Sequence, residues 1–236
     1  MNILVLILGI LPGFVWLLFY LREDIDHEPK KEIFYVFLAG SGITFIALGF
    51  EYLLSDAAKW VSVNQCQPQA CALWSVLFLF ILAAIEEFFK FSAAFLAVSR
   101  SKYFDIPLDA MIYMIVVALG FATVENIGAL SGQLRQGTLV SDIVSTTMLR
   151  FVGATLLHTL SSATVGYYWA RGIIKGRLFG FIALGLLAGT LLHAFFNFLV
   201  IKYEDAVIYP VILLVIVAFF VINDFEKLKI NEATTN

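Results

Sequence analysis

Residues 83–91 read AAIEEFFKF, which places two adjacent carboxylates and a lysine near the middle of an apolar segment. This segment runs from Trp74 to Val98, and about 20 apolar residues are enough to span a bilayer. An ionised side chain near the bilayer centre costs about 3 kcal/mol on insertion scales. Because Lys90 lies one helical turn from both Glu86 and Glu87, a structural ion pair explains one carboxylate but not the second. We therefore expect a functional site around these residues.

The composition of the whole chain is typical of an integral membrane protein. Of the 236 residues, 61% are hydrophobic and 14% are charged, and the mean hydropathy is +0.92. A soluble domain is closer to half apolar and one quarter charged. The net charge of −3, without any basic stripe, indicates that nucleic acid is not a partner.

Apolar segments of spanning length predict an all-α, polytopic transmembrane helix bundle with about seven spanning helices. The longest loop is expected at residues 55–73, and Asp105 is expected to cap the fourth helix, with Pro107 in its first turn. We expect residues 1–222 to form one transmembrane domain and residues 223–236 to form a polar, frayed cytoplasmic tail. The expected spans are residues 2–21, 33–54, 74–98, 108–130, 147–170, 179–201 and 206–222.

The distribution of lysine and arginine predicts the orientation, because cytoplasmic loops are enriched in these residues. Ten of them lie in the first, third and fifth loops and in the tail, and four lie on the opposite side. We therefore expect a multi-pass cell-membrane protein with its N-terminus outside and its C-terminus in the cytoplasm. This orientation puts Cys66 and Cys71 in an outside loop, where they can form a disulfide or remain thiols.

Strongly polar residues recur inside four of the apolar segments. From a rise of about 1.5 Å per residue, their depths are similar enough for them to meet in the middle-to-outer part of one bundle. Ser161 and Ser162 lie close to the histidine of the fifth segment, but a serine in a membrane helix usually bonds its own backbone. The polar set is Glu86, Glu87, Lys90, Glu125, Asn126, His158, His193 and Asn197.

These residue types favour the activation of water. A partly desolvated carboxylate can act as a general base, and imidazole or carboxamide N–H groups can stabilise an oxyanion. The sequence contains no His-Glu-x-x-His helix and no Gly-x-Ser-x-Gly turn, which excludes those two protease signatures. Zinc also accepts histidine and carboxylate ligands, so the same region can instead hold a zinc ion through Glu86, Glu125, His158 and His193.

At these positions the sequence resembles the PrsW family of membrane proteases, within a wider group that includes the CAAX-processing and bacteriocin-processing enzymes. The resemblance covers about residues 11–199 and begins weakly with Leu-Pro-Gly at 11–13 and Asp-His-Glu-Pro at 26–29. It is strong at four motifs, which are Glu86-Glu87-x-x-Lys90, Gly120-Phe121-Ala122-x-x-Glu125-Asn126, His158, and His193-x-x-x-Asn197.

This resemblance implies an intramembrane endopeptidase that cleaves a single-span or other membrane-anchored protein. PrsW-like members cut an anti-sigma factor on its outer side, which starts regulated proteolysis. The wider group has been regarded both as metalloproteases and as glutamate proteases. We favour a glutamate-activated water without a cofactor, and keep a zinc-dependent protease as the alternative.

The resemblance also implies roles for individual residues. Glu86 or Glu87 would be the base, and Glu125 would position water, although the CAAX-processing relatives carry a histidine in place of Glu125. His158 would also position water. Lys90 and Asn126 would be structural partners of the charges, and the oxyanion would be bound by His193 and Asn197.

Two other functions are consistent with intramembrane charge. A proton-coupled or ion-coupled transporter also uses glutamate, histidine and lysine inside the membrane. The paired half-repeats and broken helices common in transporters are not evident in this sequence. A catalytically inactive relative that shields membrane partners is the other alternative, and the intact polar set argues against it.

Overall fold

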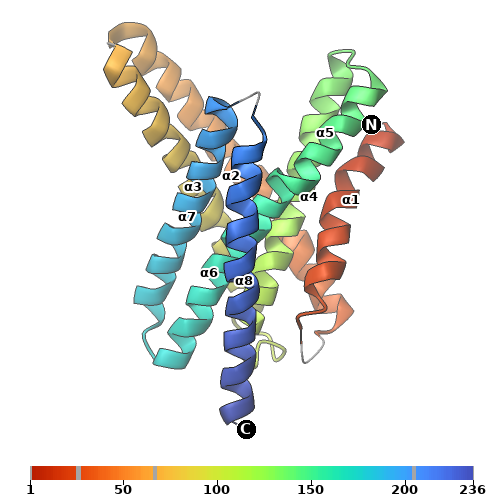
Figure 1. Ribbon diagram of the computed structural model, residues 1–236, viewed down its shortest axis with the longest axis vertical. Helices are drawn as coiled ribbons and strands as arrows, with labels where there is room; N and C mark the ends of the chain where they lie inside the picture. Colours follow the sequence, from red (N-terminus) through yellow and green to blue (C-terminus); the bar gives the residue numbers. More distant parts are fainter. Residues whose placement is uncertain (1, 25–27, 66–67, 204–205, 236) are drawn as a thin grey trace.

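The computed structural model describes residues 2–24, 28–65, 68–203 and 206–235, with side chains described except at 57–65, 68–73 and 231–235. Within this part of the chain there are eight α-helices and no strand, which confirms the predicted all-α bundle. The chain passes through the bundle seven times, because α5 and α6 follow each other in one pass, and the termini lie at opposite ends (Figure 1). The helices are α1 (Ile3–Tyr20), α2 (Lys30–Gln65), α3 (Pro68–Val98), α4 (Asp109–Arg135), α5 (Val140–Val152), α6 (Ala154–Lys175), α7 (Leu178–Lys202) and α8 (Ile208–Thr235).

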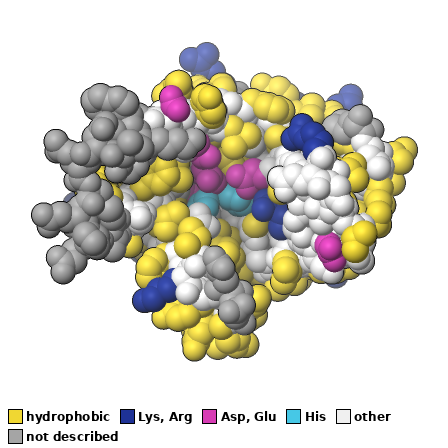
Figure 2. All heavy atoms as spheres, turned by 90° about the horizontal axis from the view of Figure 1, so that it is seen from above, with side chains coloured by type: hydrophobic (Ala, Val, Ile, Leu, Met, Phe, Trp, Pro, Cys, Tyr) yellow, Lys and Arg dark blue, Asp and Glu magenta, His cyan; other side chains and the backbone are white. Residues whose placement is uncertain are grey.

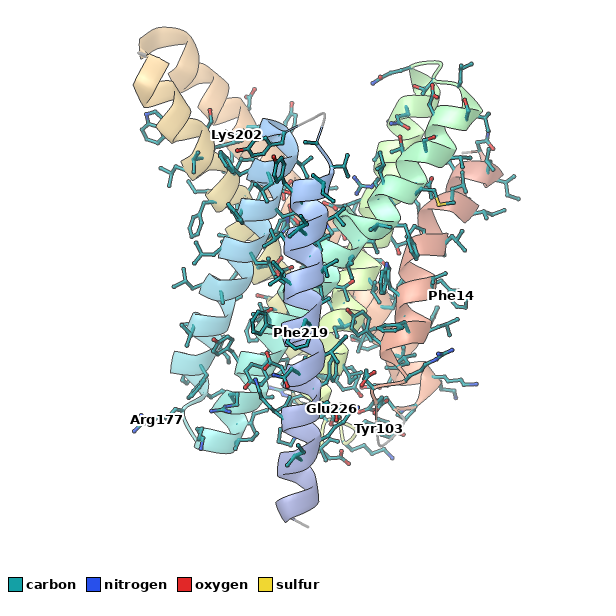
Figure 3. The ribbon with its side chains drawn as sticks, viewed as in Figure 1. Phe14, Tyr103, Arg177, Lys202, Phe219 and Glu226 are labelled. Atoms are coloured by element: carbon teal, nitrogen blue, oxygen red, sulfur yellow. The ribbon has the colours of Figure 1, made fainter. Side chains whose placement is uncertain are left out.

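The bundle has apolar sides and charged ends. In the described residues, six segments are long and apolar enough to cross a membrane, namely α1, α2 as far as Asp56, α4, α5 with α6, α7, and α8 as far as Ile230. Phe14 and Phe219 lie on the sides of the bundle, whereas Arg177 and Lys202 lie toward opposite ends (Figure 3). The chain is therefore a multi-pass membrane protein.

Helix α4 forms the centre of the bundle and packs against α1, α2 and α6. Every side chain from Asp109 to Thr123 is buried, as expected for a helix surrounded by other helices. Helix α2 approaches α4 very closely, because a Cβ atom at Gly40 would lie 2.1 Å from the backbone oxygen of Val117. This contact fixes α2 beside the site.

The prediction of a long loop at residues 55–73 is wrong. Helix α2 continues to Gln65 and α3 begins at Pro68. The 36 residues of α2 extend about 54 Å, which exceeds a hydrocarbon core of about 30 Å. Hydropathy therefore falls near Ser55 where the helix leaves the apolar layer and not where it ends. The choice between a disulfide and free thiols at Cys66 and Cys71 lies outside the described side chains.

The prediction of a single helix at residues 147–170 is also wrong, because this region forms parts of two helices, α5 and α6. Helix α5 starts earlier, at Val140, and the break falls at Gly153, which has φ −95° and ψ −93°. Beside the break, the carbonyl of Phe151 accepts the indole N–H of Trp16 on α1 at 3.0 Å. Helix α6 ends at Lys175, and the next residue, Gly176, caps it with a positive φ of 62°.

Two further boundaries differ from the predictions. Helix α4 begins at Asp109, whose carboxylate accepts the backbone N–H groups of Asp105 and Ile106 at 3.0 and 2.9 Å, so Asp105 is not its cap. The tail expected to be frayed is helical, because α8 continues to Thr235. Phe225 and Leu228 are buried there, so α8 packs on the bundle beyond its most apolar part.

Candidate active site

Four helices bring the predicted polar residues together inside the bundle. Helix α3 supplies two carboxylates and a lysine, α4 a carboxylate and an amide, and α6 and α7 one histidine each. Carboxylate and histidine side chains gather in a central hollow when the bundle is seen from the end at which the N-terminus lies (Figure 2). The buried members of this group are Glu86, Glu87, Lys90, Asn126, His158 and His193.

Glu87 is fully buried and surrounded by hydrogen-bond donors. Its Oε1 atom accepts from the Lys90 ammonium at 2.6 Å and from the Ser161 hydroxyl at 2.8 Å. The same atom lies 2.9 Å from Nδ1 of His193, and Oε2 accepts from Ser162 at 3.2 Å. A buried carboxylate requires such partners. Glu87 therefore serves as an anchor that fixes the surrounding side chains.

Lys90 joins this anchor to the second histidine. Its ammonium nitrogen lies 3.1 Å from Nδ1 of His158, and Phe121 covers it with the ring centroid 5.2 Å away. An ammonium group can only donate, so Nδ1 of His158 accepts and its Nε2 carries the hydrogen. That Nε2 lies 2.7 Å from Oε2 of Glu125. The contacts thus fix both the tautomer and the orientation of His158.

Glu86 has a very different environment from its neighbour Glu87. Its Oε2 atom is buried and has no hydrogen-bond partner in the described part of the chain. This oxygen lies 3.7 Å from Nδ1 of His158 and 3.8 Å from Nε2 of His193, which are too long for hydrogen bonds. The two imidazole rings meet edge to face with centroids 5.0 Å apart. Glu86 therefore presents an unengaged carboxylate oxygen between two histidines.

The same three residues fit a metal ion in donor type and spacing. Glu86, His158 and His193 each offer one ligand atom, and these atoms lie within 4.8 Å of one another. Zinc binds imidazole nitrogen and carboxylate oxygen at about 2.0–2.2 Å, so one ion can be reached by all three. Lys90 would then have to release Nδ1 of His158, which it contacts at 3.1 Å.

Asn126 links three helices rather than facing the carboxylates of α3. Its amide donates to the Thr155 hydroxyl at 3.0 Å, and its oxygen accepts from Nε of Arg150. The Arg150 guanidinium also lies 3.6 Å from Oε2 of Glu125. Asn126 therefore ties α4 to α5 and α6 beside Glu125.

Asn197 lies one turn beyond His193 on α7 and is half-buried. It makes no hydrogen bond to any residue within the described ranges. The structure therefore brings His193 into direct contact with the cluster, whereas no contact between Asn197 and the cluster is found among the described residues.

Three contributions to the site were missed from the sequence. Arg150 was counted only as a basic residue at the edge of the expected span 147–170, and no local motif distinguishes it. Ser161 and Ser162 were expected to bond their own backbone, yet both donate to Glu87 from α6. Glu51 on α2 lies close enough to interact electrostatically with Glu125 and Lys90, and its position in an apolar run was the available signal.

The fold and this cluster define a class of protein, a polytopic helical membrane protein with a buried carboxylate–histidine site. A family model described as PrsW family intramembrane metalloprotease matches residues 28–222. The chain therefore belongs to the PrsW family and is a membrane protease, which confirms the resemblance seen in the sequence.

Curated relatives agree with this assignment. The chain is similar to a "Protease PrsW" of Geobacillus kaustophilus, with 29% identity over 83% of this chain and 79% of the relative. It is similar to the protein of the same name from Clostridioides difficile, with 27% identity over 95% and 90% of the two chains. The Bacillus subtilis "Protease PrsW" is 24% identical over 94% of each chain. No solved structure matches.

Proposed function

We propose that this chain hydrolyses a peptide bond in a membrane-anchored protein, using a water molecule activated by Glu86. The observation that carries the proposal is the buried Oε2 atom of Glu86, which has no hydrogen-bond partner among the described residues and faces two imidazole nitrogens. A general base must have a free lone pair within reach of the water that it deprotonates. Glu87 lacks this property because donors already occupy both of its oxygens.

The histidines define where the water would lie. His193 points Nδ1 at the Glu87 carboxylate, so neutral His193 carries its hydrogen there and presents a lone pair at Nε2. A water between Glu86 and His193 can then donate one hydrogen to each, with its oxygen lone pair free to attack. The resemblance implied that His193 donates to the oxyanion, whereas this tautomer makes it an acceptor.

In the proposed reaction, one proton moves from water to Glu86 and then from Glu86 to the leaving amine. Glu86 removes a proton from water, and the hydroxide attacks the carbonyl carbon of the scissile peptide bond. In this proposal Asn197, one turn beyond His193 on α7, would supply an N–H group to the resulting oxyanion. As the C–N bond breaks, the protonated Glu86 returns its proton to the leaving amine. The products are a carboxyl group and an amine, and the base is restored.

The position of the site supports a membrane-anchored substrate. The hollow that holds the carboxylates opens at the N-terminal end of a bundle whose sides are apolar (Figure 2). With the N-terminus outside, as the basic residues predict, cleavage would occur in the outer half of the membrane. We propose a single-span protein, with an anti-sigma factor as the substrate class that the family resemblance implies.

A zinc-dependent form of the same hydrolysis is the second candidate. The spacing of Glu86, His158 and His193 favours it, and these residues would hold the ion. Zinc would polarise the attacking water and the substrate carbonyl. Glu125 would then keep the hydrogen-bonded His158 ring in place from outside the ligand set.

A reconstituted cleavage assay tests the proposal and separates the two forms. Purified protein in liposomes is given a single-span anti-sigma protein that carries a fluorescent tag on each side of the membrane. The proposal expects cleavage by the natural chain that survives a membrane-permeant chelator. Loss of cleavage in chelator and recovery with zinc would establish the metal form. No cleavage of any single-span substrate would contradict the proposed function.

A further inference from the structure

Arg150 is the residue of α5 that reaches the site. Its guanidinium crosses to α4, where Nε donates to the side-chain oxygen of Asn126 and Nη2 lies 3.6 Å from Glu125. The side chain is 24% exposed, and the Glu125 side chain is 19% exposed. Both therefore lie at the border between the buried cluster and the hollow.

Helix α5 is held in a position that makes this contact. It is separated from α6 by the break at Gly153, so its direction is not imposed by α6. The indole of Trp16 on α1 binds the carbonyl of Phe151, the residue after Arg150. The rings of Trp16 and Phe151 also stack, with centroids 5.4 Å apart. Trp16 on α1 thus holds the C-terminal end of α5, which carries the Arg150 guanidinium.

Arg150, Glu125 and His158 form a series of contacts that leads to the base. Glu125 accepts from Nε2 of His158 at 2.7 Å and faces Arg150 with the same oxygen. On its other side, Nδ1 of His158 lies 3.7 Å from Glu86. A carboxylate that orients a histidine often has its own outer partner, and at metal sites removing such a partner typically costs 10- to 100-fold in metal affinity or activity.

We propose that Arg150 is a positioning residue of this site. It holds the Glu125 carboxylate so that His158 keeps Nδ1 directed toward Glu86 and Lys90. Asn126 contributes by holding the guanidinium at Nε, which leaves Nη2 directed at Glu125. The kinetic part of this inference rests on the proposed function, whereas the placement of the His158 ring does not.

A double-mutant cycle tests whether Arg150 acts through Glu125. The variants are Arg150→Gln, Glu125→Gln and the two combined, and Arg135→Gln is the control because Arg135 is exposed at the end of α4. We expect Arg150→Gln to lower kcat roughly 10- to 100-fold with little change in KM. Added to Glu125→Gln, it should cause no further loss, because residues that act in one network are not additive.

Two kinetic outcomes would overturn the inference. A raised KM with an unchanged kcat would make Arg150 a substrate contact. A full additional loss in the double mutant would show that Arg150 acts independently of Glu125. Where Arg150→Gln does not fold, Arg150→Lys replaces it, since a lysine keeps the charge but lacks the planar, fixed donors with which the guanidinium contacts Asn126 and Glu125. The same pattern with a smaller loss is then expected.

A spectroscopic measurement decides the point without any substrate. The chain contains three histidines, so selective ¹⁵N-histidine labelling gives few signals, and His158→Gln assigns one of them. We expect Arg150→Gln to shift the Nε2–H signal of His158 and Arg135→Gln to leave it in place. An unchanged His158 signal in folded Arg150→Gln would overturn the inference. If the natural chain cleaved no substrate, the proposed function would fail. The His158 signal in Arg150→Gln would still decide the role of Arg150.

Discussion

At the scale of single residues, the site depends on two adjacent glutamates that face different surroundings. Glu87 is held by donors from α3, α6 and α7, whereas one oxygen of Glu86 has no partner within the described residues. Consecutive positions on a helix point in directions about 100° apart, so neighbouring carboxylates can serve different purposes. We propose that Glu87 serves stability and that Glu86 serves proton transfer.

This division predicts that two matched substitutions have very different effects on stability. Glu87→Gln leaves the Lys90 charge buried without its counter-ion, and breaking a buried pair typically costs roughly 3 to 5 kcal/mol. Glu86→Gln removes no hydrogen bond of this kind and should leave the unfolding temperature nearly unchanged. Thermal unfolding of both variants in detergent makes the comparison. Equal losses, or a larger loss in Glu86→Gln, would show that the assignment is reversed.

A pH effect is expected outside the membrane-spanning segments, at Glu28. Burial raises the pKa of its carboxyl to about 7, nearby Asp24, Asp105 and Glu32 add to the rise, and a hydrogen bond with Tyr113 opposes it. The folded protein then holds a proton that the unfolded chain releases near pH 4.5. This contribution to stability is complete below that pH and is lost as the pH rises through about 7.

The unfolding temperature should therefore fall as the pH is raised from about 5 to about 8. Glu28→Gln cannot ionise and should remove part of that fall. The measurement is the unfolding temperature of both proteins across this range. The same slope in both would mean that Glu28 does not contribute.

Single residues also show how far the sequence alone could predict the site. Glu86, Lys90 and His158 were recognisable because charge and imidazole are costly inside an apolar run. Arg150 lies in the first turn of the expected span 147–170, where a basic residue at a membrane edge is common, so nothing in the sequence linked it to Glu125. Which of the two adjacent glutamates is free also depended on contacts from α6 and α7, which a single sequence does not reveal.

At the scale of helices, the contact of α2 with α4 holds one wall of the site. Gly40 and Gly120 allow this contact, since a Cβ atom at either would lie 2.1 Å from a backbone oxygen of the other helix. Backbone atoms cannot rotate away as a side chain can. The two helices would have to separate to accept any larger residue.

Gly40→Ala should therefore lower the free energy of unfolding by about 1 to 3 kcal/mol, the usual range for overpacking. Gly42→Ala, two residues along the same helix, is the control because no atom lies within 4 Å of its added Cβ. Gly42→Ala should be neutral or slightly stabilising, since alanine favours helix. The measurement is the free energy of unfolding of both variants by denaturant. An equal loss in both would contradict the claim that α2 and α4 are in tight contact at Gly40.

Helix boundaries were predicted less well than helix existence, for a physical reason. Hydropathy reports where a helix lies in lipid, whereas helices such as α2 and α8 continue beyond the apolar layer. The break at Gly153 lies inside an apolar run, so a hydropathy pattern merges α5 with α6. The number of passes was predictable because each needs its own apolar segment.

At the scale of the whole molecule, an odd number of passes puts the termini at opposite ends of the bundle (Figure 1). We propose that the N-terminal end, where the hollow opens, faces outward and that the C-terminal tail is cytoplasmic. The chain supports this orientation through its basic residues, which are concentrated at the C-terminal end. A reporter fused to the C-terminus should be protected from reagents outside intact cells. Labelling of that reporter from outside would contradict both the orientation and cleavage on the outer side.

The central claim is that Glu86 activates the water that cleaves a membrane-anchored substrate. Its most direct test is the cleavage rate of purified Glu86→Gln against the natural chain, with Glu226→Gln on exposed α8 as the control. The amide keeps the size of the side chain but cannot accept the proton, so cleavage should fall roughly 100-fold or more. Glu226→Gln should cleave at the natural rate. A folded Glu86→Gln that cleaves as fast as the natural chain would contradict the account.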